Sequence, residues 1–374
     1  MYTNSQTYAA MNDFDFCYSF PSIRGIQAGR EYYVSMCPLK LIPKLFHFDD
    51  ESVLPEMRAQ RLLNKARIPE IARYIVNNRS DYTFSAITAS IDGTVNFEPV
   101  DASSADASRL RLGTLHIPMD SSFIVNDGQH RRAAIEMALE KDPSLGNETI
   151  AVVFFIDRGL ARCQQMFADL NRHAIRPSAS LGVLYDHRDV VGSITKYVAL
   201  NHNLFSRWLE FERSSLSPRS RKLFTLSALH FATRELLTDE DLKNTENAQK
   251  KALAYWSTVS DKVIEWNMVA NSEITAGELR ANFVHGHAIA LQALGRLGKS
   301  LLDEYPNSWI DKLQKLNKID WNRKNTKDWE GRAMTAGRMC KTGSHIALTT
   351  NLIKMKLGLP LNEEDKTFEK VKND

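Results

Sequence analysis

Cysteine is scarce and scattered in this sequence. The four cysteines, Cys17, Cys37, Cys163 and Cys340, include no Cys-x-x-Cys pair. This spacing argues against a structural zinc site and against a disulfide framework, so we expect no bound metal and a reducing compartment. The four side chains are expected to pack as small apolar groups, which is the common situation for unpaired cysteine.

Long apolar runs and a strong excess of one charge are also lacking. No run approaches the roughly 20 apolar residues of a membrane-spanning helix, and the polar, acidic N-terminus does not resemble a secretory signal. We therefore expect a cytoplasmic protein without membrane contact. The net charge is only +3, so local basic patches must decide whether nucleic acid is a partner.

Several catalytic motifs are missing as well. The sequence contains no Walker A loop, nucleophile elbow or iron–sulfur spacing, and its histidines are too dispersed to argue a Ser-His-Asp triad. These absences favour a binding protein over an enzyme. Apolar residues make up 43% of the chain and charged residues 25%, which is ordinary for a globular protein, and the length suggests two domains.

Hydrophobic periodicity differs between the two halves of the chain. In the first half we interpret 1–20 as an arm, and we predict helices over 55–78 (broken near Pro69) and 160–170 and strands over 31–37, 82–91, 109–117 and 149–156. Beyond about residue 185 the predicted elements are helices over 190–201, 222–237, 247–268, 282–304, 309–316 and 345–357. The pattern predicts an α+β protein, with a mixed domain over 1–185 packed on a mostly helical domain over 186–374.

A short cationic segment follows the apolar run that ends at residue 126. The first N–H groups of a helix lack internal partners and attract anions, a glycine lets a ligand approach the backbone, and an arginine can hold phosphate oxygens. We therefore predict a strand, a tight turn and a helix start with an anion site. The alternative is a plain link in which the aspartate caps the helix and the arginines are solvated. The residues are Asp127, Gly128, Gln129, His130, Arg131 and Arg132.

Two further blocks combine charged and polar groups. Asn171 and Arg172 close a predicted helix, where they could satisfy its last carbonyl groups or return to the Asp127–Arg131 turn and complete a pocket. Residues 185–189 alternate acidic and basic side chains. For that block we favour a salt-bridged junction between the two halves over a catalytic role.

Two basic stretches in the second half indicate DNA contact. Cations attract phosphates, serine hydroxyls can bond to the backbone, and the interleaved Trp321 and Trp329 could stack on bases. The alternative is a solvated surface with both tryptophans in the core. The cations of the first stretch are Arg213, Arg219, Arg221 and Lys222, and those of the second are Arg323, Lys324, Lys327, Arg332, Arg338 and Lys341.

The segment Asp127–Arg131 resembles the signature of DGQHR-domain proteins, a branch of the ParB/sulfiredoxin-like superfamily. Flanking blocks resemble the DndB family of DNA sulfur modification proteins, so the resemblance covers nearly the whole chain. It implies a ParB/sulfiredoxin-like N-terminal domain. These blocks are 20–33, 63–74, 167–177, 184–189, 217–226 and 321–341.

The resemblance also implies roles for the signature residues. Some ParB-like relatives bind CTP, and a kinase relative with a similar turn uses ATP, so a site for ATP or another nucleotide with Mg is implied. Arg131 would be the main phosphate contact, and Gln129 and His130 would be secondary contacts. Asp127 would either form the turn or place its carboxylate beside the Mg that accompanies the nucleotide. The third signature residue is Gln here, whereas the kinase relative has His, and the residues alone predict no cofactor.

The family resemblance implies a function for the whole chain. It implies a repressor that binds double-stranded DNA at the promoter of its own phosphorothioate modification gene cluster. Other DNA sulfur modification proteins and a second copy of the chain are further expected partners. The rival function is a nucleotide-hydrolysing enzyme that acts on DNA through the signature turn. The repressor and enzyme functions can coexist if a nucleotide bound at the turn changes the affinity of the protein for DNA.

Overall fold

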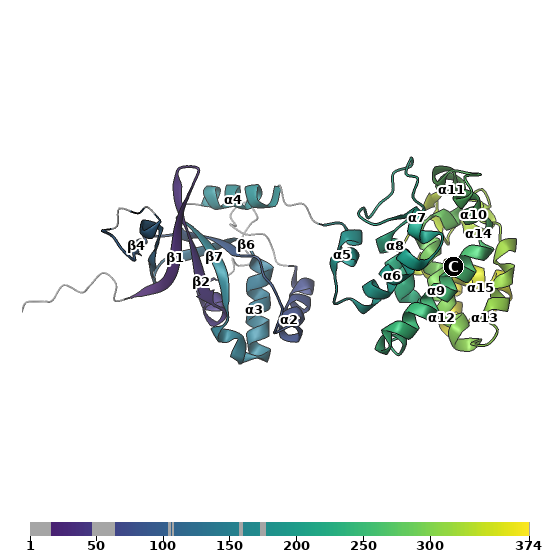
Figure 1. The fold of residues 1–374 in the computed structure, drawn as a ribbon, viewed down its shortest axis with the longest axis horizontal. Coiled ribbons are helices and arrows are strands. Elements are labelled where there is room, and N and C mark those ends of the chain that lie inside the picture. The colour runs from purple at the N-terminus through teal and green to yellow at the C-terminus, as the bar shows by residue number, and fades with distance from the viewer. Residues whose placement is uncertain are drawn as a thin grey trace, which may run out of the picture. The chain divides into compact units, whose positions relative to one another are not determined.

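The computed structural model describes residues 16–46, 64–103, 106, 108–156, 160–172 and 177–373 (Figure 1). The chain divides into two compact units, 1–175 and 176–374. The first contains a mixed β-sheet with helices, and the second is mostly helical. The predicted α+β class is therefore confirmed.

The first unit is built on a seven-stranded sheet with the order β4-β5-β1-β2-β7-β3-β6. Its pairs are antiparallel except for β3 and β7, which run parallel. The strands are β1 (Cys17–Gln27), β2 (Arg30–Pro38), β3 (Ile87–Asp92), β4 (Asn96–Pro99), β5 (Leu112–Pro118), β6 (Ser122–Asp127) and β7 (Thr149–Ile156).

Helices cover both faces of this sheet. Alternate residues of a strand point to opposite faces, and Val125 of β6 lies in the main core whereas Asn126 contacts Met166 of α4. Helices α2 and α3 pack together on the core side (Figure 1), so α4 covers the other face. The helices are α1 (Ile42–Leu45), α2 (Ile68–Asn77), α3 (Gln129–Lys141) and α4 (Leu160–Arg172), with 3-10 turns η1 (Leu39–Leu41), η3 (Lys65–Arg67), η4 (Arg109–Arg111) and η5 (Pro143–Asn147).

Most of the predicted elements of this unit are present, with corrections to their bounds. The strand predicted over 109–117 is the 3-10 turn η4 followed by β5, which starts at Leu112. Strand β1 begins at Cys17, so 17–20 is a strand rather than an arm, and Pro21 and Gly25 conceal its alternating pattern. Strand β3 starts only at Ile87, and the short β4 was not predicted. Helix α2 begins at Ile68 with Pro69 in its first turn, so among the described residues the predicted helix starts beside this proline after the 3-10 turn η3, instead of continuing through it with a break. Residues 55–63 lie outside the described part.

In the second unit, α12 packs against both α8 and α15. Close crossing with α8 requires Gly295, because a Cβ there would lie 2.1 Å from the carbonyl oxygen of Ala232. The helices are α5 (Ala179–Tyr185), α6 (Val190–Asn201), α7 (Phe205–Trp208), α8 (Leu226–Leu236), α9 (Thr245–Lys262), α10 (Ile264–Ala270), α11 (Ala276–Asn282), α12 (Ala288–Glu304), α13 (Trp309–Leu313), α14 (Thr326–Trp329), α15 (Gly343–Leu357) and α16 (Glu363–Asn373), with 3-10 turns η6 (Asp241–Lys243), η7 (Val284–Gly286) and η8 (Gln314–Lys318).

Strand pairing does not vanish after residue 185 as the sequence suggested. Two short pairs are present: β8 (Leu209–Glu210) with β9 (Phe224–Thr225), and β10 (Met334–Thr335) with β11 (Arg338–Met339). The predicted helix over 247–268 is two helices that meet at Val263. The one predicted over 282–304 starts at Ala288.

Candidate functional sites

The signature turn joins β6 to α3 through a glycine in a left-handed conformation. Gly128 has φ 104°, which favours glycine, and a Cβ there would lie 3.0 Å from Arg131 Nη2 and from Ile87 Cγ1. Gly128 is also the N-cap of α3, and no side chain caps this helix. The strand–turn–helix geometry is as predicted, but the alternative in which Asp127 caps the helix is wrong.

The Arg131 guanidinium folds back over this turn and is bonded within the unit. Its Nη1 donates to Ser85 Oγ at 2.7 Å, and its Nη2 donates to Asp127 Oδ2 at 2.7 Å and to the Ala86 carbonyl at 3.1 Å. The side chain is 21% exposed. A phosphate at the turn would therefore have to compete with three internal acceptors for the Nη groups of Arg131.

Two buried amides close to the turn are incompletely hydrogen-bonded. Gln129 is 4% exposed, and neither polar atom of its side chain has a hydrogen-bond partner among the described residues. Asn126 donates to Ser90 Oγ at 2.7 Å, but its Oδ1 is buried without a donor. An unpaired buried amide group costs on the order of 1–3 kcal/mol, so these groups favour a polar ligand or ordered water at this position.

The neighbouring signature residues connect the turn to the segments before it. His130 Nε2 accepts from the Asn64 backbone N–H at 3.0 Å. Arg132 is 6% exposed, donates to two carbonyl groups at the end of α1 and pairs with Glu136. Arg132 therefore has a structural role, and the prediction that it is solvated or holds a phosphate is wrong.

The predicted second side of this pocket is only partly described. Asn171 and Arg172 are the last two residues of α4. Their side chains, together with residues 173–176, lie outside the described residues. Their return to the signature turn therefore stays a prediction.

The alternating block at 185–189 forms contacts inside the second unit. Asp189 Oδ2 lies 2.7 Å from Nε2 of His230 on α8, and Asp186 Oδ1 accepts from the backbone N–H groups of Arg188 and Asp189. These contacts fasten the start of α6 to α8. They favour the structural interpretation of this block and place it in the second unit.

The first basic stretch is a loop with free cations. Arg213, Arg219 and Arg221 are exposed, and their side chains have no hydrogen bond or ion pair to any described residue. Lys222 differs, because its Nζ donates to the Arg207 carbonyl at 2.8 Å. Three of the four predicted cations are thus available to phosphates, and Lys222 helps to hold the loop.

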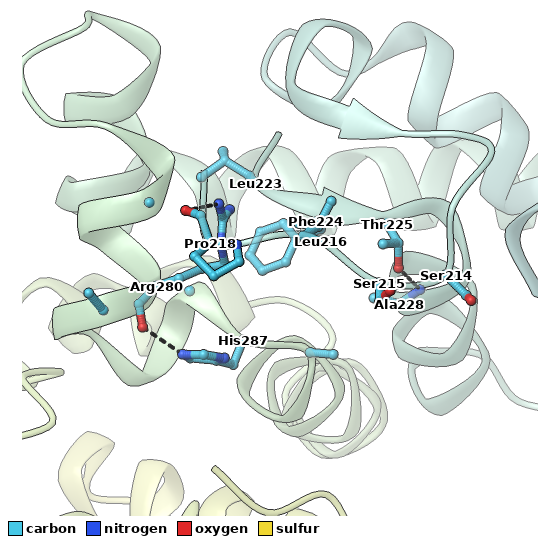
Figure 2. A pocket seen from close by; sticks show the side chains of 14 residues that line it. Ser214, Ser215, Leu216, Pro218, Leu223, Phe224, Thr225, Ala228, Arg280 and His287 are labelled. Atoms are coloured by element: carbon cyan, nitrogen blue, oxygen red, sulfur yellow. Dashed lines mark hydrogen bonds between the residues drawn. The ribbon is translucent and has the colours of Figure 1, made fainter. Parts of the chain in front are cut away.

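The conformation of this loop is set by Arg280 of α11, a residue that sequence reasoning did not identify. Its guanidinium donates to the carbonyl groups of Lys222 and Ser220 at 2.6 Å each and is 3.3 Å from that of Ser217. It is also 3.3 Å from the Pro218 carbonyl (Figure 2). No carboxylate neutralises it among the described residues. Burial lowers its pKa, yet arginine remains protonated at neutral pH.

Arg323 connects the second basic stretch to the same helix. Its Nη1 donates to the carbonyl groups of Arg280 and Ala281 at 3.3 and 3.2 Å, and its Nη2 donates to that of Gly337 at 2.9 Å. Arg323 is therefore another cation bonded to neutral carbonyl groups. The two basic stretches, about a hundred residues apart in the chain, meet at α11.

Three cations of the second stretch are exposed and form no hydrogen bond or close ion pair with a described residue, namely Lys324, Lys327 and Arg338. The charge of Lys327 nevertheless helps to lower the pKa of the neighbouring Asp328 carboxyl. Lys341 is also exposed, and its Nζ lies 4.9 Å from the ring centroid of Phe231. We define the basic surface as the seven exposed cations of both stretches: Arg213, Arg219, Arg221, Lys324, Lys327, Arg338 and Lys341.

Three residues of the second stretch have structural positions instead. Arg332 is 7% exposed, and its Nη1 and Nη2 each lie 2.6 Å from an oxygen of Glu369. Trp321 and Trp329 are buried and stacked, with ring centroids 5.2 Å apart. Burial and the pair with Glu369 therefore argue against Arg332 as a DNA contact, and the tryptophans belong to the core rather than to a base-stacking surface.

These features define a two-unit α+β protein with a strand–glycine–helix turn in one unit and a basic surface in the other. The chain belongs to the DndB family, described as DNA-sulfur modification-associated, which matches residues 20–360. The family resemblance seen in the sequence is confirmed, and it associates the protein with DNA sulfur modification. No curated protein and no solved structure matches the chain.

Membrane-spanning helices and metal-ligand clusters are both absent from the described part of the chain. None of its helices is both long and apolar enough to cross a bilayer. The described residues also contain no group of three or more His, Cys, Asp or Glu side chains placed to hold a metal ion. Buried Cys37 has its thiol pKa raised to about 12 by burial, so it is expected to be unreactive.

Proposed function

We propose that this protein is a DNA-binding regulator, a repressor of the gene cluster for DNA phosphorothioate modification. The observation that carries the proposal is the convergence of the two basic stretches on α11. Arg280 and Arg323 fix the backbone of both stretches without neutralising any cation of the basic surface. The cations of the basic surface are therefore free to contact DNA phosphates. Such contacts position a protein on the duplex and dominate its affinity.

A repressor is expected to prefer its own promoter. The purified protein should bind a duplex carrying the promoter of its gene cluster at least about a thousandfold more tightly than random DNA at the same salt concentration. Fluorescence anisotropy with both duplexes measures this ratio. Equal affinity for the two would leave a nonspecific DNA-binding protein and contradict the repressor assignment.

Nucleotide binding at the signature turn is a second candidate function, and it rests on Gln129. The first turn of α3 has no side-chain cap, and the buried Gln129 amide beside it has no partner. Both groups suit a phosphorylated ligand such as ATP with Mg. The hydrogen bonds of Arg131 to Ser85, Ala86 and Asp127 hold the turn in place. Arg131 is therefore a positioning residue for this turn as well as a candidate phosphate contact.

Exchanging Gln129 for methionine separates a ligand role from a structural one. Gln129→Met keeps the side-chain length and removes an unpaired buried amide, so the free energy of unfolding should stay level or rise. Affinity for ATP with Mg, measured by titration calorimetry, should fall about tenfold because a charge-assisted contact is lost. Gln292→Met is the matched control, since Gln292 of α12 is also buried with an unpaired amide oxygen. Undiminished ATP affinity in Gln129→Met would remove Gln129 from the site.

A further inference from the structure

A cavity of about 440 Å³ lies beneath the first basic loop, inside the second unit (Figure 2). The loop forms one wall, the β9–α8 corner forms another, and α11 with the start of α12 closes the third side. The volume falls in the range of small-molecule sites, roughly 300–1,000 Å³. The exposed arginines of the same loop are not among the described residues that line the cavity, and neither candidate function uses the cavity.

The lining combines an apolar body with a cationic end. Leu216 and Phe224 supply apolar and aromatic surface, Arg280 supplies a guanidinium, and the loop adds the hydroxyls of Ser214 and Ser215. The lining includes no acidic residue. Such a lining favours a ligand that has an apolar or aromatic body and one anionic group.

The start of α12 adds a second positive feature at this cavity. This 17-residue helix has His287 as its N-cap, and no side chain caps it. His287 Nε2 donates to the Arg280 carbonyl at 2.8 Å (Figure 2), and burial lowers the His287 pKa, so the imidazole is neutral at pH 7. Uncapped N–H groups at a helix start attract anions, and the first residues of this helix start, His287 and Ala288, line the same cavity as Arg280.

We propose that this cavity binds a small amphipathic anion, and that its occupancy weakens DNA binding by drawing Arg280 away from the loop. The second part of this inference rests on the proposed DNA-binding function, whereas the first part does not. The ligand class is a carboxylate, sulfonate or phosphate attached to an apolar or aromatic body of roughly nucleoside size.

Arg280 provides the coupling because the loop and an anion would compete for it. The guanidinium now holds four neutral carbonyl groups of the loop, and an anion is a stronger acceptor than a neutral carbonyl. When an anion binds the guanidinium, the backbone that carries Arg219 and Arg221 loses the four hydrogen bonds from Arg280 and keeps only the anchor at Lys222 among those described here. Ligand and DNA then oppose each other, and by linkage each weakens the other by the same factor.

The site itself is tested without DNA. The probe is 8-anilinonaphthalene-1-sulfonate, an aromatic sulfonate that becomes fluorescent in an apolar environment, with adenosine 5′-monophosphate and benzoate as competitors that distinguish phosphate from carboxylate ligands. We expect saturable binding, and in Ala281→Trp, which fills the cavity from its exposed rim, a dissociation constant raised at least tenfold. Ala254→Trp, at an exposed position of α9, is the matched control and should bind as the parent does.

A second variant guards against misfolding of the first. Ser215→Asp places an acidic group on the exposed loop wall, so it should repel the probe while its thermal melt matches that of the parent. Probe affinity unchanged in both cavity variants would overturn the site. Loss of probe binding in Ala254→Trp as well would do the same, because binding would then not depend on the cavity.

The coupling is tested by titrating labelled duplex DNA with and without saturating probe. We expect the DNA dissociation constant to rise at least fivefold with probe in the parent and in Ala254→Trp, and to be unaffected in Ala281→Trp. Unchanged DNA affinity in the probe-saturated parent would overturn the coupling. Failure of all proteins to bind DNA would instead contradict the proposed function and leave the probe titrations to decide the site.

Discussion

Removing Arg219 and Arg221 together is expected to weaken DNA binding about 100-fold near 0.1 M salt. Both side chains are exposed on the loop that Arg280 holds, and neither has a partner among the described residues. A charge-assisted contact to a phosphate contributes about 1.5 kcal/mol or more, roughly tenfold for each arginine. The double alanine variant should also flatten the dependence of log affinity on log salt by about two units, since each phosphate contact releases about one counterion.

The control for this prediction removes two exposed lysines outside the basic surface. Lys315→Ala with Lys318→Ala, both on η8, lowers the net charge by the same amount. It should leave the salt dependence of DNA binding nearly unchanged if contacts, rather than net charge, decide affinity. Anisotropy titrations at several salt concentrations measure both slopes. Equal slopes for the two double variants would take the 213–222 loop out of the interface.

The second large effect is a loss of stability on replacing Arg332, which the sequence had predicted to contact DNA. Arg332→Ala should lower the free energy of unfolding by about 3–5 kcal/mol, because it leaves a mostly buried Glu369 carboxylate without its bidentate partner. Chemical denaturation followed by circular dichroism measures this loss. Below the melting temperature, the DNA affinity of the folded variant should equal that of the parent.

Two further variants separate this ion pair from general weakening of α16. Arg332→Met with Glu369→Leu removes both charges together and should recover most of the lost stability, since a buried pair and an apolar pair of similar volume are often equivalent. Lys366→Ala removes an exposed cation from the same helix, where it pairs with Glu363, and should change little. A stable Arg332→Ala variant that binds DNA poorly would restore Arg332 to the interface.

The position of Arg280 illustrates why part of the site could not be predicted. Its segment, Ala276–Asn282, is a short helix without a basic cluster, and nothing in its spacing marks one arginine as special. Its role arises because folding brings the carbonyl groups of 217–222 within reach of its guanidinium. Contacts between residues some sixty positions apart have no local signal in the sequence.

The opposite error occurred with Arg332, Trp321 and Trp329. A run of cations with interleaved aromatics predicts a nucleic-acid surface by composition, but composition does not say which side chains face the core. Glu369, the partner of Arg332, lies 37 residues further along the chain. Burial of the tryptophans follows from their packing against each other and against His285. Local composition therefore overestimated the number of side chains in this stretch that are exposed.

Local features were determined by the sequence alone. A strand that ends at an Asp-Gly pair, followed by good helix formers, folds as a strand, a left-handed glycine and a helix because each step depends on neighbouring residues only. The buried strand Thr149–Ile156 and the helix Val190–Asn201 were predicted with the bounds observed. Family membership was also visible in the sequence, because blocks of residues carry it.

Only the tertiary structure decided which charged groups are free. It turned Arg131 back onto Asp127, buried Arg132 against α1, and joined two distant basic stretches through Arg280 and Arg323. The physical reason is that a guanidinium has five donors and a long reach, so its partners are whichever acceptors the fold brings near. Residue type and spacing show where cations occur, whereas the packed chain decides which of them remain for a phosphate.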